Sequence, residues 1–208
     1  MPTENPIEYL ISNGYLAQPT FRTLLASPGL KVSESDLARI KSSLDIPTDV
    51  LARLSMSDQY VAVVLDAVES LLKAGHKRML VFAASVELTR LLAAVLNMRG
   101  VEGYAITGGT SKQARSNAVR AFKSNVTQSI VLVNYGVLTT GFDAPKASAG
   151  VIARPTKSLV LYSQMIGRLI RGPKAGGTES CEVVTVVDTR LPGFGDIAEA
   201  FSNWEDIW

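Results

Sequence analysis

From residue 78 onward, short unbroken apolar runs alternate with stretches of helical periodicity, and this alternation constrains the fold more than any other feature. An unbroken apolar run of about four to eight residues is typical of a strand buried on both faces. The predicted strands are 79–83, 103–107, 129–133, 150–153 and 182–187. Strands that alternate with helices at this spacing indicate a parallel sheet covered on both sides. We therefore expect an α/β fold with a three-layer, open, mostly parallel sheet of five or six strands.

The segments between these runs carry signals for the start and end of helices. One helix is predicted to follow Ser57 and to end at Gly75, and Ser85 is suited to cap another that ends near Gly100. Further helices are predicted to begin at Ser33, to span 111–123 and to run through Arg168. In such folds sites lie at the carboxyl ends of the strands, so the loops after Ala83, Thr107 and Asn134 become candidates.

The N-terminal part lacks this alternation. Residues 1–32 carry four prolines and several turn signals, which predicts an extended arm with one short helix around Ile7–Asn13. We divide the chain into an N-terminal arm and linker segment, 1–54, and a main domain, 55–208. The main domain is predicted to end in a helix that places Phe201, Trp204 and Trp208 at i, i+3 and i+7. That helix either docks on the domain or binds a partner.

The basic residues are concentrated in the middle of the chain. The net charge of +2 does not indicate a polyanion partner, but residues 108–125 hold four basic and no acidic side chains. Residues 139–177 add six basic side chains against Asp143 alone. This distribution favours a local anion-binding surface, although clustering of this size also arises by chance.

The presence of only one cysteine and one histidine excludes several kinds of site. One cysteine, Cys181, excludes a disulfide framework and a cysteine-based zinc site, and one histidine, His76, excludes a histidine-based metal site and a Ser-His-Asp triad. We expect no bound metal in this chain. The sequence has no secretory leader and no apolar run of about 18 residues, so we expect a cytoplasmic protein without a membrane partner.

The most informative cluster lies near residue 170. On a helical wheel Leu159, Tyr162, Ile166 and Leu169 form one stripe, with Gln164, Arg168 and Arg171 about half a turn away. One face can anchor to the core while the other presents two guanidiniums and an amide, which suit the oxygens of a transferring phosphoryl group. The alternative is an ordinary basic, solvated helix face.

Three loops after predicted strands have the composition of phosphate contacts. Ser85 begins a helix after the first strand, and residues 107–111 contain two glycines and two hydroxyls. Residues 139–145 read Thr-Thr-Gly-Phe-Asp-Ala-Pro, in which Asp143 can accept from ribose hydroxyls. Each loop alone could be a plain turn, but together they suggest a track along a sugar–phosphate backbone.

These motifs resemble those of superfamily 2 helicases, in order and in spacing. Gln164-x-x-Gly-Arg168-x-x-Arg171 resembles motif VI, residues 139–143 resemble motif V, and residues 81–85 resemble motif IV. The sequence of residues 132–145 is similar to the corresponding segment in the DEAD/DEAH-like branch that contains restriction translocases and phage-type helicases. The resemblance implies the C-terminal RecA-like domain of an ATP-dependent helicase or translocase.

The resemblance implies a role for each matched residue. Arg168 and Arg171 would be arginine fingers for the γ-phosphate of ATP, and Gln164 would lie at the interdomain cleft. Gly141 and Asp143 would border the same cleft, near the ribose or near motif VI. The residues expected to contact nucleic-acid phosphates are Ser85, Gly109, Thr139 and Thr140. Such contacts to backbone imply binding that is independent of sequence and sensitive to salt.

The chain departs from the family pattern in lacking two motifs. It contains neither Gly-x-x-x-x-Gly-Lys-[Ser/Thr] nor Asp-Glu-x-[His/Asp], which cradle the phosphates of ATP and hold Mg²⁺. We therefore expect ATP and Mg²⁺ to be bound mainly by an N-terminal RecA-like ATPase domain of the same parent chain, of which this sequence is a fragment. Alone it should not hydrolyse ATP. The expected substrate is DNA, with RNA as the alternative. Rival functions are a non-catalytic nucleic-acid-binding or regulatory module, and an interaction domain that uses Trp204 and Trp208.

Overall fold

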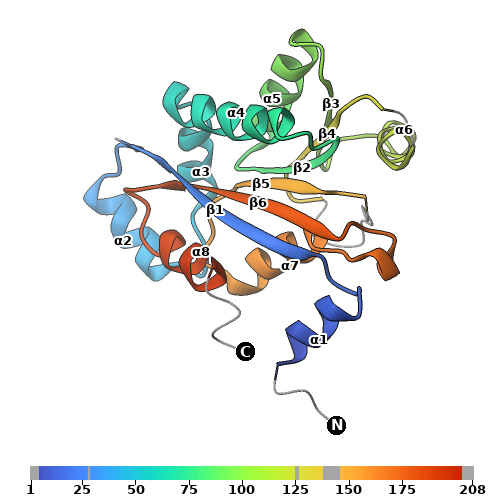
Figure 1. Ribbon diagram of the computed structural model, residues 1–208. Coiled ribbons are helices and arrows are strands. Elements are labelled where there is room, and N and C mark those ends of the chain that lie inside the picture. The colour runs from blue at the N-terminus through green and yellow to red at the C-terminus, as the bar shows by residue number, and fades with distance from the viewer. Residues whose placement is uncertain (1–4, 28, 125–126, 138–145, 203–208) are drawn as a thin grey trace.

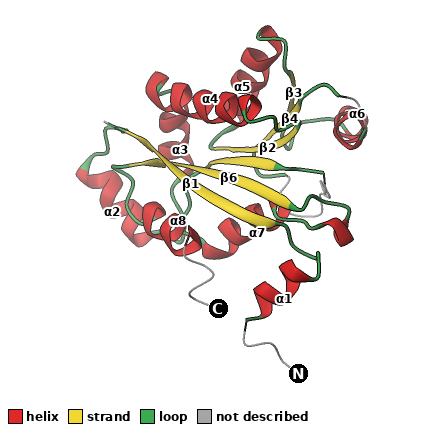
Figure 2. Cartoon of the chain, viewed as in Figure 1, coloured by secondary structure: helices red, strands yellow, loops and turns green. Residues whose placement is uncertain are grey.

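The computed structural model describes residues 5–27, 29–124, 127–137 and 146–202, with side chains as far as Glu199. Six strands form one sheet in the order β1-β6-β5-β2-β4-β3, and every pair of neighbours is parallel (Figures 1 and 2). The strands are β1 (Gln18–Ala26), β2 (Arg78–Ala83), β3 (Glu102–Ile106), β4 (Ile130–Asn134), β5 (Ala149–Ala153) and β6 (Ser180–Asp188). The predicted α/β class and its parallel sheet are confirmed. We call the edge at which the strands begin the amino edge and the opposite one the carboxyl edge.

Helices cover both faces of the sheet (Figure 1). The helices are α1 (Pro6–Ser12), α2 (Glu34–Ser42), α3 (Thr48–Ser55), α4 (Asp58–Lys73), α5 (Val86–Met98), α6 (Lys112–Lys123), α7 (Leu159–Leu169) and α8 (Phe194–Ser202), with a 3-10 turn η1 at Pro173–Ala175. Buried side chains of α2 to α5 form one core, and those of α6, α7 and α8 form the other. Successive residues of β2 alternate between the two cores: Val81 lies in the first, Leu80 and Phe82 in the second. This double burial explains why the strand is apolar without interruption.

Serine side chains cap the starts of the predicted helices, including the predicted cap at Ser85. The Ser57, Ser85 and Ser111 hydroxyls accept from backbone N–H groups of α4, α5 and α6. Ser33 forms a reciprocal capping box with Asp36 at the start of α2. These local signals therefore placed the helix starts correctly.

The extended arm predicted for residues 1–32 is wrong in one respect. Its short helix exists as α1, but Gln18–Ala26 is the strand β1, which pairs with β6 from Gln18↔Ser180 to Ala26↔Asp188. β1 is an edge strand, where Pro19 is tolerated and polar side chains such as Arg22 reach solvent. Its sequence consequently lacks the apolar run by which the buried strands are identified. The division of the chain at residues 54 and 55 stays a prediction.

Trp204 and Trp208 lie outside the described residues, and the side chain of Phe201 is not described. Within the described ranges, none of the helices combines the length and the apolar character needed to cross a membrane.

Candidate functional site

The carboxyl edge brings together the residues that follow four strands. Ala83 of β2 lies opposite Ala153 of β5, and Asn134 of β4 lies opposite both Phe82 and Ile106. The strands β5, β2, β4 and β3 therefore end side by side, and the loops that follow them are neighbours. The sequence predicted three of these loops as candidate phosphate contacts, after β2, β3 and β4.

Ser85 lies at this edge as a helix cap. Its Oγ accepts from the N–H of Leu88 at 3.1 Å, and its carbonyl accepts from Thr89 Oγ1 at 2.7 Å. The residue is buried. Its hydroxyl thus fixes the N-terminus of α5 at the carboxyl edge, where the first-turn N–H groups favour negative charge. Contact between Ser85 and a phosphate stays a prediction.

Gly109 lies in a tight exposed turn after β3. The turn is closed by two hydrogen bonds, from Thr107 N to Thr110 Oγ1 at 2.9 Å and from Thr110 N to Thr107 O at 3.1 Å. A side chain at Gly108 would meet no atom within 4 Å, so the turn faces open space. Arg115 Nη2 donates to Thr107 O at 3.3 Å, which places a guanidinium beside the same turn.

Tyr135 and Arg154 are the residues at this edge that the sequence did not single out. The Arg154 guanidinium lies over the Tyr135 ring, 5.3 Å from its centroid, and Nη2 is 3.7 Å from Asp45 Oδ2. The Nε atom of Arg154 is buried and finds no hydrogen-bond partner among the described residues. The sequence could have identified both residues as site candidates from their positions directly after β4 and β5.

Asp45 ties this edge to the connection between α2 and α3. Its Oδ1 accepts from Thr156 Oγ1 and from Lys157 N, both at 2.8 Å. Lys157 Nζ donates in turn to the carbonyls of Ile40 at 2.5 Å and Ser43 at 2.9 Å. These bonds hold the loop that leads from β5 into α7.

Gln164 and Arg168 lie on α7, whose other face is anchored. Met165, Ile166 and Leu169 are buried, and Tyr162 Oη lies 2.8 Å from Thr185 Oγ1 of β6. Burial raises the pKa of Tyr162 to about 12. Leu159 was predicted in this stripe, but it is the first residue of the helix and is 54% exposed. Gln164 is exposed and Arg168 is half-buried.

Arg171 does not share the helical face of Gln164 and Arg168, as the wheel assumed. The helix ends at Leu169, and Arg171 forms an antiparallel bridge with Leu16. Ala17 N donates to Ile170 O at 2.9 Å, and Thr178 N donates to Arg171 O at 3.0 Å. Since Ala17 precedes β1 and Thr178 precedes β6, these bonds place Arg171 at the amino edge.

A close backbone approach makes this placement possible. A Cβ on Gly172 would meet the carbonyl oxygen of Gly14 at 2.4 Å, so only glycine lets residues 14–16 and 171–172 run side by side. The hydrogen bond from Gly172 N to Tyr15 O, at 3.0 Å, lies in this contact. Arg171 therefore lies on a doubly bridged segment rather than on a free helix end.

The remaining predicted site residues, Thr139, Thr140, Gly141 and Asp143, lie outside the described residues. They belong to the connection from Asn134 at the carboxyl edge to Ala149 at the amino edge. Within the described ranges, no group of three or more His, Cys, Asp or Glu side chains could hold a metal ion. Cys181 is buried, which raises the pKa of its thiol to about 12.

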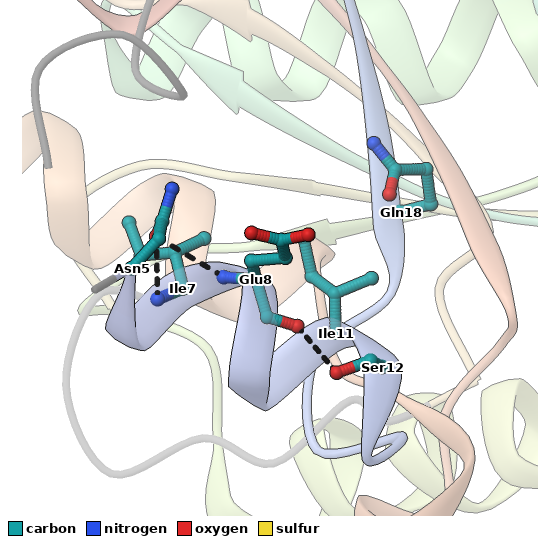
Figure 3. A pocket seen from close by; sticks show the side chains of 6 residues that line it. All are labelled: Asn5, Ile7, Glu8, Ile11, Ser12 and Gln18. Carbon is teal, nitrogen blue, oxygen red and sulfur yellow. Dashed lines mark hydrogen bonds between the residues drawn. The ribbon is translucent and has the colours of Figure 1, made fainter. Parts of the chain in front are cut away.

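A hollow of about 510 Å³ lies between α1 and the start of β1 (Figure 3). Its described lining consists of Gln18 and residues of α1 and its N-cap, namely Asn5, Ile7, Glu8, Ile11 and Ser12. Glu8 contributes the one charged side chain of that described lining. This lining therefore does not favour a phosphate ligand.

Comparison with known proteins identifies relatives over much of the chain. A family model described as the helicase conserved C-terminal domain matches residues 62–173, more than half of the chain. A 51.5 kDa protein of a Lactococcus phage is 27% identical over 79% of this chain and 34% of its own length. The Saccharomyces cerevisiae protein IRC3, named for ATP-dependent helicase activity, is 30% identical over 66% of this chain and 20% of its own length. The chain thus spans about a third or less of these relatives.

Solved structures share the fold. A fragment of a type I restriction enzyme HsdR subunit from Vibrio vulnificus matches 90% of this chain and 35% of that chain, with a TM-score of 0.58 and 17% identity. A DEAD box protein from Methanococcus jannaschii matches 67% of this chain and 36% of that chain, with a TM-score of 0.54 and 24% identity. The fold is therefore the RecA-like one that the sequence predicted.

Proposed function

The chain belongs to the family of helicase conserved C-terminal domains, and from that premise we propose that it forms half of an ATP-dependent helicase or translocase that acts on DNA. In this proposal Arg168 and Arg171 stabilise charge on the γ-phosphate of ATP, and Gln164 couples the nucleotide to domain closure. The carboxyl edge carries one strand of nucleic acid. ATP and Mg²⁺ are held mainly by a separate N-terminal RecA-like domain.

The placement of Arg171 is the observation that carries the proposal. An arginine finger must present its guanidinium in a fixed position, because catalysis of phosphoryl transfer is largely positioning and electrostatics. The Arg171 backbone is fixed from two sides, by Leu16 and by Thr178. The sequence lacks both a phosphate-cradling loop and an acidic Mg²⁺ motif, so the nucleotide that this arginine serves would be bound elsewhere.

The carboxyl edge supplies features suited to a nucleic-acid strand. The N-terminus of α5 at Ser85 and the open turn at Gly109 offer backbone N–H groups, and Arg154 stacked on Tyr135 offers a cation beside an aromatic face. We propose that Thr139 and Thr140 extend this track, and that Gly141 and Asp143 lie toward the nucleotide. Contacts of this kind read no base edges, so binding should be independent of sequence and weaken as salt rises.

The test is Arg171→Ala in the full-length parent protein. Loss of an arginine finger should lower ATP turnover by about 10³-fold or more while nucleic-acid binding is retained. Arg90→Ala, on the exposed face of α5, is the matched control and should leave turnover unchanged. Unchanged turnover in Arg171→Ala would contradict the finger role. A parent protein without the two missing motifs would instead favour the alternative of a non-catalytic nucleic-acid-binding module.

A further inference from the structure

A second hollow, of about 450 Å³, opens at the amino edge beside the starts of β2, β5 and β6. Its polar lining comes from segments far apart in the sequence, and turn glycines complete it. The polar lining residues are Lys77, Arg78, Ser124, Lys146, Ser148 and Thr178. None of them belongs to the carboxyl edge, and none is a residue to which the proposed function assigns a role.

The charges of the two hollows are opposite. Three cations and no carboxylate are among the described residues that line the second hollow, whereas Glu8 is the charged residue of the first. Of the two lysines in the second hollow, Lys77 is exposed and Lys146 is half-buried. A concave surface lined by charges of one sign concentrates ions of the opposite sign. The second hollow therefore suits an anion.

Arg78 is a rigidly held cation of this lining. Its Nε donates to Phe122 O at 2.7 Å, its Nη1 to Gln128 O at 2.7 Å, and its Nη2 to Ser124 O at 2.9 Å. The residue is 6% exposed, and burial lowers the pKa of its guanidinium, which remains protonated at neutral pH. A fixed charge that is partly shielded from water acts on a nearby anion more strongly than a solvated one.

Two walls of the hollow are also held in place. Ser148 Oγ lies 3.0 Å from His76 Nδ1, and His76 Nε2 lies 3.4 Å from Glu182 Oε2, so the serine hydroxyl is held beside β5. Thr178 is joined to Arg171 through its backbone N–H. The hollow therefore adjoins the segment that carries the proposed arginine finger.

We propose that this hollow binds phosphate groups. The lysine ammonium groups can donate to phosphate oxygens, and the Arg78 guanidinium, whose N–H groups donate to backbone carbonyls, adds a fixed positive charge. The phosphates can come from a nucleotide or from a nucleic-acid backbone, and the two sources are distinguished by experiment.

The test compares two probes on the 208-residue chain, inorganic tripolyphosphate and a single-stranded oligothymidylate. The variant is Lys77→Glu combined with Lys146→Glu. The matched control is Lys31→Glu combined with Lys41→Glu, two exposed lysines that do not line the hollow, and it changes the net charge equally. At about 100 mM salt the hollow variant should bind at least one probe about tenfold more weakly, and its salt dependence should fall. The control should change binding about twofold or less.

The pattern of loss identifies the source. Weaker tripolyphosphate binding alone supports nucleotide phosphates, weaker oligonucleotide binding alone supports a backbone, and loss of both supports a site open to either. Unchanged binding of both probes overturns the proposal. Thermal unfolding checks that the variant is folded, and the neutral pair Lys77→Gln with Lys146→Gln replaces it if it is not. Because Arg154→Ala probes the carboxyl edge separately, this proposal and the proposed function can fail independently.

Discussion

The two edges of the sheet are built differently, although the same six strands end at both. At the carboxyl edge β2, β3 and β5 each pass through a turn into a helix, and the side chains of Ser85, Thr110 and Ser158 close these turns. At the amino edge the main chain itself forms the contacts, as in the bridge between Leu16 and Arg171. The first edge leaves helix N-termini that attract anions, and the second fixes the position of one segment. Under the proposed function, this single sheet would carry the nucleic-acid strand at one edge and hold the segment of Arg171 at the other.

The largest effect is expected from breaking the amino edge at Gly172. Gly172→Ala should lower the free energy of unfolding by roughly 3 kcal/mol, because the new Cβ would overlap the Gly14 carbonyl oxygen. Urea unfolding of the 208-residue chain measures this loss. Gly167→Ala is the control: a side chain there meets nothing within 4 Å, so this substitution in α7 should stabilise the chain by about 0.5–1 kcal/mol. Equal effects at both glycines would contradict the close approach.

A smaller and more selective effect is expected from Arg154 at the carboxyl edge. Arg154→Ala should weaken binding of single-stranded DNA about tenfold and reduce the slope of log affinity against log salt by about 1. Fluorescence anisotropy at several salt concentrations measures both quantities, with Arg90→Ala as control. ATP turnover of the parent at saturating nucleic acid should be retained. If turnover fell while binding did not change, the separation of roles between the two edges would be wrong.

The smallest effect is expected in α7, which joins the two edges. Tyr162→Phe removes the buried hydrogen bond to Thr185 but keeps the ring, so the free energy of unfolding should fall by about 1 kcal/mol. Urea unfolding measures this change, and DNA binding and ATP turnover, measured in parallel, should be retained. A selective loss of either activity would show that the hydroxyl positions one edge rather than anchoring the whole helix.

Local patterns in the sequence were sufficient for most of the fold. Buried strands such as β2 pack against both cores and are therefore apolar throughout, and serine caps such as Ser111 act within one turn of chain. β1 was missed because an edge strand does not need an apolar run. The turn at Arg171 was missed because a helical wheel extends past the residue at which the helix ends.

Local sequence patterns did not predict contacts between segments that are distant in the sequence. The Arg154 guanidinium meets the Tyr135 ring only because β4 and β5 both lie next to β2. Asp45 accepts from Thr156, 111 residues away, and nothing in either neighbourhood predicts that bond. The basic hollow likewise depends on three strands that start side by side. Sequence patterns identified candidate residues, but only the topology of the sheet shows which of these residues are in contact.

The pairing of β1 with β6 has a consequence for how the chain acquires its structure. The first of the described strands pairs with the last of them, since Gln18 pairs with Ser180. During synthesis the amino edge around Arg171 therefore cannot close until β6 has been made, whereas the pairing of β2, β3 and β4 involves a much shorter stretch of chain. Contacts of such high sequence separation are slow to form, because the entropy of closing the loop is lost before the contact stabilises it. We expect refolding to show the central strands protected from hydrogen exchange before β1 and β6.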